Sequence, residues 1–350
     1  MKINIQKFNL KEVDEFINFS KSYYSNQETT DTEIVKNKFI DYEDQHSYHL
    51  KIKNEDEVLG RVVLNERKIV LKGKELKVTQ VTDLLINQKN KDPFVFIKLV
   101  KSYNSLKNNL VIHTSNENSE NIYKKFFKFN IIFFMKSFGF PIKPIKILEN
   151  LFNLKLYFLY FLDLIFSYIF KGTLSIISIL NSIKFENCSF NQLKGDGISK
   201  FKKNSKFSMD RSNEFINWRF EKNPNHYYCK KIVKHNSIIG YAVFRNSEYL
   251  GFKVTLLIDL YLLKSTTALD NLKIRQQLLL QSVKSGSDIF FSIINANNKK
   301  LSRVFGFPIL PINDSLLKHA TPIFCSSINE SINIKELSEL HFTLADLDYF

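Results

Sequence analysis

An almost unbroken apolar run near the middle of the chain limits the folds available to it. Residues 156–170 read LYFLYFLDLIFSYIF, and residues 174–183 continue the apolar character after a short polar break. A helix that is apolar on every side must be covered on every side. The run also divides the 350 residues into two flanks of ordinary domain size. We therefore predict three parts: residues 1–140, a hydrophobic helical connector and basic linker over 141–210, and residues 211–350.

Three interpretations of this run stay open. A bilayer span is not expected, because it needs about 20 apolar residues and Asp163 in the run would cost about 2.5–3.5 kcal/mol on insertion. Burial of the run between two domains is the simplest alternative. The third is a peripheral membrane or partner contact through residues 156–183. An anionic leaflet would suit the flanking lysines, which include Lys143, Lys146, Lys155, Lys171 and Lys184.

The two flanks share one order of predicted elements. In the first, strands at 49–53, 58–65 and 76–86 precede a helix at 93–106, a strand at 110–114, a helix at 118–127 and a strand at 131–138. In the second, strands at 227–234, 238–245 and 252–263 precede a helix at 267–284, a strand at 288–293, a helix at 297–305 and closing strands near 322–325 and 341–344. Alternation and helical periodicity define these elements. They predict an α/β (α+β) fold with two mixed-sheet domains joined by the apolar connector.

Charge and cysteine usage narrow the partners and the compartment. The net charge of +15 comes with abundant Lys, Asn, Ile and Phe, a composition that an AT-rich genome produces without any anionic partner; binding of an anionic partner is the alternative. Nucleic acid is not expected. Cys188, Cys229 and Cys325 are far apart, and no CxxC, HExxH or P-loop pattern occurs. The chain is therefore expected to be cytoplasmic, with no metal site and no disulfide framework.

Residues 82–94, TDLLINQKNKDPF, resemble motif A of the GNAT (Gcn5-related N-acetyltransferase) family. In that family a splayed strand leads through a glycine-containing basic turn into a helix, whose free N–H groups hold the diphosphate of acetyl-CoA. The resemblance implies an acetyl-CoA donor site at Leu84, Leu85, Ile86, Lys89, Lys91 and Phe94. The chain departs from the family where Arg-Gly-x-Gly is usual. There Lys91-Asp92-Pro93-Phe94 lacks both glycines, loses one N–H and adds a carboxylate.

A candidate general acid follows in the same half. Residues 116–127 resemble the later helix of the family, in which a Tyr often protonates the thiolate of CoA, and Tyr123 stands at that position. A phenol suits this role because its ordinary pKa near 10 keeps it protonated at neutral pH. The resemblance implies Tyr123 as the catalytic residue. In a chain with 15 Tyr, a packing role for Tyr123 is the alternative.

The second half supplies candidate substrate-binding residues. Residues 211–245 contain NWRF, NP and GYAVFR segments that resemble two-domain GNAT-like proteins linked to bacterial surface-polysaccharide synthesis. Trp218 is expected to be a core anchor. Arg219 and Arg245 are candidates for binding carboxylate or phosphate, with structural ion pairs as the alternative. Asp259 is a candidate for holding a substrate amine together with Asp346 and Asp348, with solvated carboxylates as the alternative.

The resemblance implies an acyl-CoA-dependent N-acyltransferase. Its acceptor would be an amino sugar or another amine of surface-glycan synthesis, and its thioester would lie beside residues 84–86 or 258–260. The alternative is a catalytically inactive GNAT-like scaffold or binding module, which the missing glycines favour. If the connector docks on lipid, the protein associates with the inner face of the membrane.

Overall fold

The computed structural model describes residues 1–23, 27–42, 46–87, 89, 92–104, 110–115, 117–152, 155–197, 207–249, 251–263, 266–312, 322–327 and 334–347. The N-terminal half contains strands β1 (Lys2–Lys7), β2 (Ser47–Asn54), β3 (Glu57–Leu71), β4 (Lys74–Ile86), β5 (Leu110–Thr114) and β6 (Asn130–Pro141). Its helices are α1 (Leu10–Lys21), α2 (Gln27–Thr30), α3 (Thr32–Phe39), α4 (Pro93–Asn104) and α5 (Glu117–Asn121), and a π-helical turn, Ile122–Phe126, follows α5.

The rest of the chain begins with the connector. It contains α6 (Pro144–Phe152), a 3₁₀ turn (Tyr157–Leu159) and the long helix α7 (Tyr160–Leu180). The following helices are α8 (Phe190–Gln192), α10 (Asn213–Ile216), α11 (Ala268–Lys284), α12 (Lys299–Ser302) and α14 (Ile334–Leu337). The strands are β7 (Ile183–Cys188), β8 (Phe207–Met209), β9 (Tyr227–Lys234), β10 (Ser237–Tyr249), β11 (Phe252–Leu262), β12 (Ile289–Asn295), β13 (Leu310–Pro311) and β14 (Pro322–Ser327).

The described strands form one mixed sheet in the order β1-β2-β3-β4-β5-β14-β6-β12-β11-β10-β9-β7. In the N-terminal half, β3 and β4 are antiparallel, β4 and β5 are parallel, and β14 lies between β5 and β6. In the C-terminal half, β10 and β11 are antiparallel, β11 and β12 are parallel, and the end of β6 lies between β12 and β13. The same order of pairing therefore occurs in both halves, and the predicted mixed α/β fold is confirmed.

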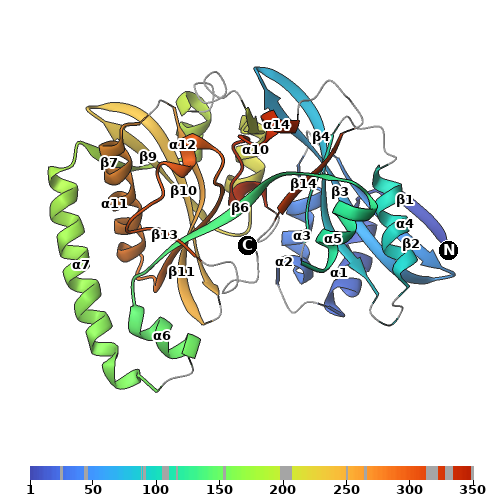
Figure 1. The fold of residues 1–350 in the computed structure, drawn as a ribbon, viewed down its shortest axis with the longest axis horizontal. Coiled ribbons are helices and arrows are strands. Elements are labelled where there is room, and N and C mark those ends of the chain that lie inside the picture. Colours follow the sequence, from blue (N-terminus) through green and yellow to red (C-terminus); the bar gives the residue numbers. More distant parts are fainter. Residues whose placement is uncertain are drawn as a thin grey trace.

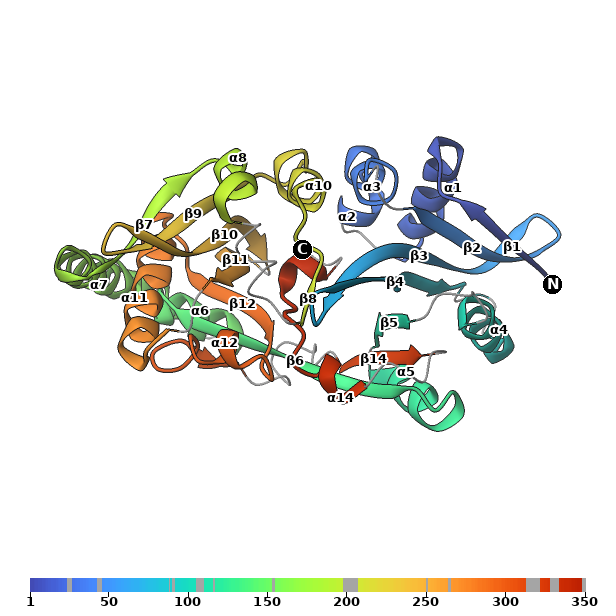
Figure 2. The ribbon, with the colours of Figure 1, turned by 90° about the horizontal axis from the view of Figure 1, so that it is seen from above.

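Two strands tie the halves together. β6 starts beside β14, where Phe134 pairs with Pro322, and ends beside β12, where Pro141 pairs with Ile289. Figures 1 and 2 show it running from one half into the other. β14 comes from the end of the chain but pairs with β5 of the N-terminal half. The predicted boundary at residue 140 thus falls inside a shared strand, and the division into domains at residues 140 and 210 stays a prediction.

Helices cover both faces of the N-terminal sheet (Figure 2), with α1 and α3 on one face and α4 and α5 on the other. α1 buries one apolar stripe, in which Val13, Phe16 and Ile17 pack with Phe39 of α3. The side chain of Asp31 caps α3 and accepts hydrogen bonds from the N–H groups of Glu33 and Ile34 at 2.9 and 3.0 Å. Local sequence features therefore determine where these helices begin and which side of each is buried.

The connector lies on the surface, so the expectation that it is buried between two domains is wrong. α7 runs along the outer edge of the C-terminal half, far from the N-terminal half (Figure 1). Only 11% of its most apolar window is buried. Residues such as Tyr168 and Leu180 are both 81% exposed. The hydropathy of a segment shows that it is apolar but does not show which part of the protein, if any, covers it.

Two cysteines that are distant in sequence are neighbours in space. Cys188 of β7 and Cys229 of β9 occupy directly opposed positions of antiparallel strands. Their Sγ atoms lie 2.7 Å apart, and both thiols are free. Cys325 is buried elsewhere, in β14. Sequence spacing gives no sign of this pairing because the strand register creates it.

Candidate functional site

The parallel strands β4 and β5 separate before β4 ends. They pair only at Thr79, Gln80 and Val81 of β4, the last opposite His113 of β5, whereas β4 continues to Ile86. We call the region beyond Val81 the N-terminal splay. Asp83, with a φ of +49°, lies at a register shift between β3 and β4, and its carboxylate accepts a hydrogen bond from Lys38 at 2.8 Å. The bulge turns the end of β4 away from regular pairing.

Most of the predicted donor-site residues lie along this strand end and the helix after it. Leu84, Leu85 and Ile86 are half-buried on β4. Leu84 and Ile86 pack against the cluster that contains Val95 and Leu99 of α4. Three further predicted residues follow in the chain: Lys89 is exposed, Phe94 is 69% exposed in the first turn of α4, and Lys91 lies outside the described residues. The structure thus gives this segment an apolar side and an accessible end.

The N-terminus of α4 already holds a carboxylate. Asp92 accepts a hydrogen bond from the N–H of Phe94 at 2.8 Å, and its backbone carbonyl accepts from Val95 at 3.1 Å. Pro93 contributes no N–H. A bound diphosphate would need these same donors and the positive end of the helix dipole. The diphosphate of a CoA thioester therefore does not fit this helix end while Asp92 caps it.

Tyr123 lies in an aromatic cluster behind the splay. It is 3% exposed, and its hydroxyl lies 3.4 Å from that of Tyr103. Its ring centroid is 4.1 Å from that of His113, and Phe129 and Phe324 pack around both rings. A buried position among aromatic rings is what the alternative role of Tyr123, packing in the core, requires. Its role as a general acid stays a prediction, because a thiolate would have to reach into the cluster.

His113 is the residue in this region that sequence reasoning missed. It occupies the last paired position before β4 and β5 separate. Burial lowers its pKa to about 3, so the ring is neutral at physiological pH. Among the described residues neither ring nitrogen has a hydrogen-bond partner, a state that costs about 1–3 kcal/mol per group. The sequence does hold one sign of this residue, because His113 follows three apolar residues within the strand Leu110–Thr114.

The corresponding separation of β11 and β12, the C-terminal splay, is closed by the chain itself. The two strands pair from Val254 opposite Ile289 to Leu257 opposite Ser292, and β11 then continues beside β10 but without β12. Residues 340–347 occupy this region: Thr343 bridges to Ile294, and the carbonyl of Phe342 accepts a hydrogen bond from the N–H of Asn295 at 2.9 Å. No ligand fits there unless this segment leaves.

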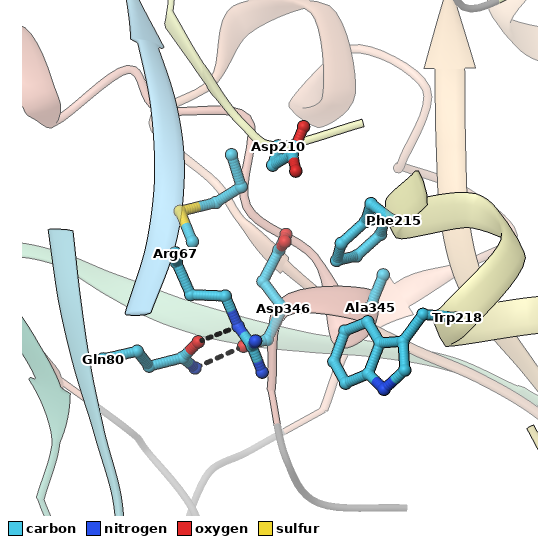
Figure 3. A pocket seen from close by; sticks show the side chains of 8 residues that line it. Arg67, Gln80, Asp210, Phe215, Trp218, Ala345 and Asp346 are labelled. Carbon is cyan, nitrogen blue, oxygen red and sulfur yellow. Dashed lines mark hydrogen bonds between the residues drawn. The ribbon is translucent and has the colours of Figure 1, made fainter. Parts of the chain in front are cut away.

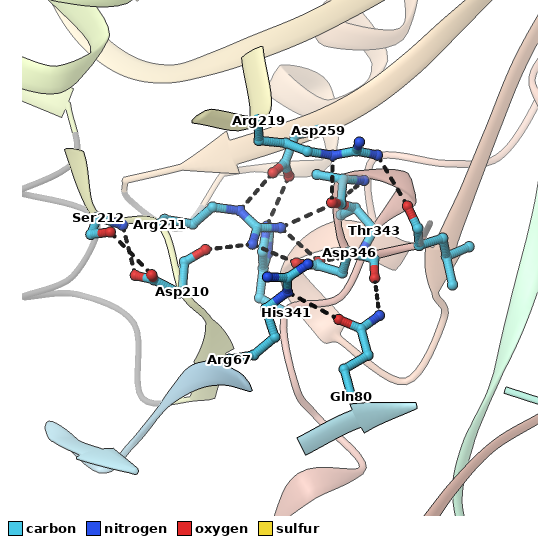
Figure 4. Close-up of polar contacts among 12 residues, drawn as sticks. Arg67, Gln80, Asp210, Arg211, Ser212, Arg219, Asp259, His341, Thr343 and Asp346 are labelled. Atoms are coloured by element: carbon cyan, nitrogen blue, oxygen red, sulfur yellow. Dashed lines mark hydrogen bonds and ion pairs between the residues drawn. The ribbon is translucent and has the colours of Figure 1, made fainter. Parts of the chain in front are cut away.

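A buried ion network fixes the closing segment (Figure 4). Arg211 donates hydrogen bonds to Asp259 at 2.7 Å and to both carboxylate oxygens of Asp346 at 2.6 and 2.7 Å. His341 lies 3.2 Å from Asp259. Burial alone would raise the pKa of Asp259, but the charge of Arg211 and the hydrogen bond of His341 hold it at about 2. Asp259 is thus an ionised partner of Arg211, and its predicted role toward a substrate amine stays a prediction.

Of the other predicted substrate-binding residues, Arg219 lies beside this network. Arg219 is 9% exposed and donates to the backbone carbonyls of Ala345 and Leu347, both at 3.0 Å. Arg245 is half-buried on β10, opposite Leu256 of β11. Asp348 lies outside the described residues. Arg219 therefore holds the closing segment in place, whereas the ligand roles of Arg219 and Arg245 stay predictions. Sequence reasoning missed Arg211, because only the fold shows that it joins β11 to the end of the chain.

A small pocket lies where the two halves meet (Figure 3). The space open to the centre of a water molecule is about 10 Å³, close to the need of one water. The guanidinium of Arg67 lies 4.6 Å from the ring centre of Trp218 and donates to Gln80 at 3.3 Å. Gln80 in turn donates to the carbonyl of Asp346 at 2.7 Å. The lining residues are Arg67, Gln80, Met209, Asp210, Phe215, Trp218, Ala345 and Asp346.

Trp218 joins the two halves, and its predicted role as a core anchor is confirmed. It is 4% exposed and stacks on Tyr42 of the N-terminal half with ring centres 4.5 Å apart. Its indole N–H donates to the backbone carbonyl of Asn37. The hydroxyl of Tyr42 donates to Asp210 at 2.8 Å. The pocket is therefore walled by groups that hold the halves together.

The helix after the C-terminal splay is capped more completely than α4. Thr267 and Asp270 exchange hydrogen bonds as a capping box at the N-terminus of α11. Asp270 also forms an ion pair with Lys234 at 2.9 Å. Two side chains, Thr267 and Asp270, accept hydrogen bonds at this helix end, whereas at α4 the half-buried side chain of Asp92 alone does so among the described residues.

Comparison with known proteins places the fold. No protein-family model and no curated protein matches the sequence. Among solved structures, N-myristoyltransferase of Saccharomyces cerevisiae with bound myristoyl-CoA matches at 10% identity and TM-score 0.56, over 97% of this chain and 88% of that one. A GCN5-related N-acetyltransferase from Anabaena variabilis matches at 10% identity and TM-score 0.55, over 94% and 73%. A probable N-acyltransferase from Enterococcus faecalis matches at 8% and 0.53, over 93% and 72%.

At these identities the comparisons establish the fold alone. The chain has a GNAT-like fold over nearly its whole length, as the resemblance of residues 82–127 and 211–245 implied. Its chemistry has to be argued from its own site.

Proposed function

We propose that this protein is an N-acyltransferase that takes its acyl group from a CoA thioester beside the N-terminal splay. The observation that carries the proposal is the difference between the two splays. The N-terminal one leaves Leu84, Leu85 and Ile86 half-buried next to an exposed helix start, whereas residues 340–347 occupy the other. The fold shared with N-myristoyltransferase and GCN5-related N-acetyltransferases supports this class of reaction.

The strand end suits the apolar part of such a donor. Leu84 and Ile86 offer hydrocarbon surface, and the backbone of β4 beyond Val81 is not paired with β5. Free strand N–H groups can hold an amide-containing arm and stabilise a developing oxyanion. The diphosphate end is the poorer fit, since it has to displace the Asp92 carboxylate or be held by side chains such as Lys89 instead. The donor supplies an activated acyl group, and the protein holds the thioester and the amine in the geometry for reaction.

The acceptor is proposed to be an amine, with an amino sugar of a surface glycan as its specific form. The resemblance of residues 211–245 supports the glycan, and no contact in the structure bears on it. Placing an amine against a thioester carbonyl accounts for much of the rate enhancement that such enzymes need. Tyr123 is the proposed general acid. Cytoplasmic localisation is likewise a proposal.

Calorimetric titration with acetyl-CoA and with longer acyl-CoAs tests the donor. We expect a dissociation constant in the micromolar range and slow thiol release when an amino-sugar nucleotide or another amine is added. The absence of heat at millimolar acyl-CoA would remove the proposal.

A second candidate function is a non-catalytic GNAT-like binding module. The carboxylate caps favour it, because Asp92 and Asp270 fill both helix ends at which a diphosphate would bind. The same titration decides between the two, since a module of this kind binds no acyl-CoA.

A further inference from the structure

The orientation of polar and apolar side chains on α7 is the reverse of that in a surface helix of a water-soluble protein. Its exposed side chains are almost all large and apolar. They cover more than one side of the helix, together with exposed residues of α6 and the turn between them. The set, which we call the α6–α7 apolar face, comprises Leu148, Phe152, Tyr157, Phe158, Phe161, Leu162, Leu164, Ile165, Phe166, Tyr168, Ile169, Ile176, Ile179 and Leu180.

The inner side of α7 carries its buried polar contacts, alongside Leu174 and Phe170, which pack on the core. Asp163 is 2% exposed, and its two carboxylate oxygens accept hydrogen bonds from the N–H groups of Ile145 and Lys146 at the start of α6, at 2.9 and 2.8 Å. Farther along, Ser178 accepts a hydrogen bond from Gln277 of α11 at 2.7 Å. Polar groups on one helix side attach it to the protein, and the opposite side is left apolar.

This attachment sets how α7 meets its surroundings. α7 contacts α6 near its start and α11 near its end, so it lies along the protein surface over its length. If it crossed a bilayer, charged residues of α11 such as Lys273 and Lys284 would have to enter the hydrocarbon, at high cost. A helix that lies flat in the headgroup region meets no such cost.

The charges around the face indicate which apolar surroundings it meets. Between residues 148 and 184 the exposed charged residues are Lys155, Lys171 and Lys184. The carboxylates of this stretch are the buried Asp163 and the half-buried Glu149, which accepts a hydrogen bond from the hydroxyl of Tyr160. Tyr157 and Tyr168, 68% and 81% exposed, have the amphipathic rings that favour a membrane–water interface. A second copy of the chain would bring the same lysines together, whereas an anionic leaflet attracts them.

We propose that the α6–α7 apolar face docks on an anionic lipid bilayer, with α7 parallel to its surface and the lysines at the headgroups. This inference does not depend on the proposed acyl transfer. The face belongs to the C-terminal half, and the N-terminal splay lies in the other half of the molecule (Figure 1). Docking therefore leaves the proposed donor site in water.

Flotation of the full-length protein with vesicles tests the proposal. Vesicles of phosphatidylcholine with 30% phosphatidylglycerol would carry the protein to the top of a density gradient, and vesicles of phosphatidylcholine alone would carry much less of it. A triple variant, F161Q/I165Q/Y168Q, should lose at least tenfold in the bound-to-free ratio, because three exposed apolar side chains become polar. L10Q/F307Q, which changes exposed apolar residues elsewhere, serves as the matched control and should bind like the unmodified protein.

A second variant separates charge from apolar contact. K155Q/K171Q/K184Q should lose about fivefold per lysine on anionic vesicles, and should bind neutral vesicles as the unmodified protein does. Circular dichroism and thermal unfolding confirm that each variant is folded. Lack of flotation with both vesicle types would overturn the proposal, as would equal binding by the apolar-face variant. So would a dimer in light scattering that becomes a monomer in that variant, because a second copy would then be the occupant.

Discussion

The two splays are built by the same order of strands and end in opposite states. The N-terminal splay has an apolar edge, a neutral His113 with no hydrogen-bond partner in the described part of the chain, and a helix end held by one carboxylate. The C-terminal splay is filled by residues 340–347, which Arg211 locks through Asp259 and Asp346. The comparison teaches that strand divergence alone does not make a binding site. A splay can bind a ligand only where the chain itself does not fill the space between the strands. Residues 340–347 fill the C-terminal splay and not the N-terminal one.

The two regions also differ in what their buried polar groups cost. In the C-terminal splay, the buried charges have partners. In the N-terminal splay, His113 stays neutral and makes no hydrogen bond to any described residue, which lowers the stability of that region. Destabilising polar groups without partners are more common where function requires them. This difference adds support to the proposal of a donor site in the N-terminal half.

Removing the charge that locks the C-terminal splay should have the largest effect. Arg211→Met leaves Asp259 and Asp346 buried without a counter-charge, at a cost of about 3–5 kcal/mol in the free energy of unfolding. Urea unfolding measures it. Arg219→Met is the matched control, with an expected cost of about 1–3 kcal/mol, because Arg219 serves neutral carbonyls. Equal costs for both variants would contradict an ionic lock, as would failure of Asp259→Asn to restore part of the stability of Arg211→Met.

Tyr123→Phe distinguishes catalysis from packing in the N-terminal splay. If the phenol is the general acid, turnover should fall by about 10²-fold or more with little change in KM. The free energy of unfolding should change by about 1 kcal/mol at most, since only one hydroxyl is lost. Steady-state thiol release gives the rates, and Tyr103→Phe is the control. Unchanged turnover would assign Tyr123 to packing.

His113 should make the N-terminal half sensitive to mild acid. Its pKa in the folded chain is about 3, well below the ordinary value of about 6.5. The unfolded chain therefore takes up a proton that the folded chain excludes, and stability is lost as pH falls from 6.5 toward 3. Between pH 7 and pH 5 the unmodified protein should lose about 2 kcal/mol more than His113→Phe.

Urea unfolding at the two pH values measures this difference. His226→Phe, a change at an exposed histidine, should leave the pH dependence as it is in the unmodified protein. Parallel pH profiles for His113→Phe and the unmodified protein would show that the folded chain does protonate this ring.

Neutralising the two helix caps should give the smallest effect. Asp92→Asn keeps a capping side chain and removes a negative charge from the proposed diphosphate site, so acyl-CoA should bind about two- to fivefold more tightly. Asp270→Asn is the matched control and should change nothing, because its splay is closed. Tighter binding in the Asp270 variant would shift the donor site to the C-terminal half.

Local patterns predicted much of this fold, and long-range contacts account for what they missed. Alternation located β4 and β11, and helical periodicity located α4 and α11. The exchange of β14 into the N-terminal half, and the closure of the C-terminal splay by residues 340–347, join segments far apart in the chain. No local signal encodes them. The exposure of α7 was missed for a related reason, because periodicity does not reveal the surroundings of a helix.

Hydrogen–deuterium exchange with and without a saturating acyl-CoA tests most directly the claim that only the N-terminal splay is open to a donor. The account predicts slower exchange in β4 and the first turns of α4, residues 82–98, and no change in β11 and the start of α11, residues 258–272. Slower exchange confined to residues 258–272, or no change in either region, would contradict it.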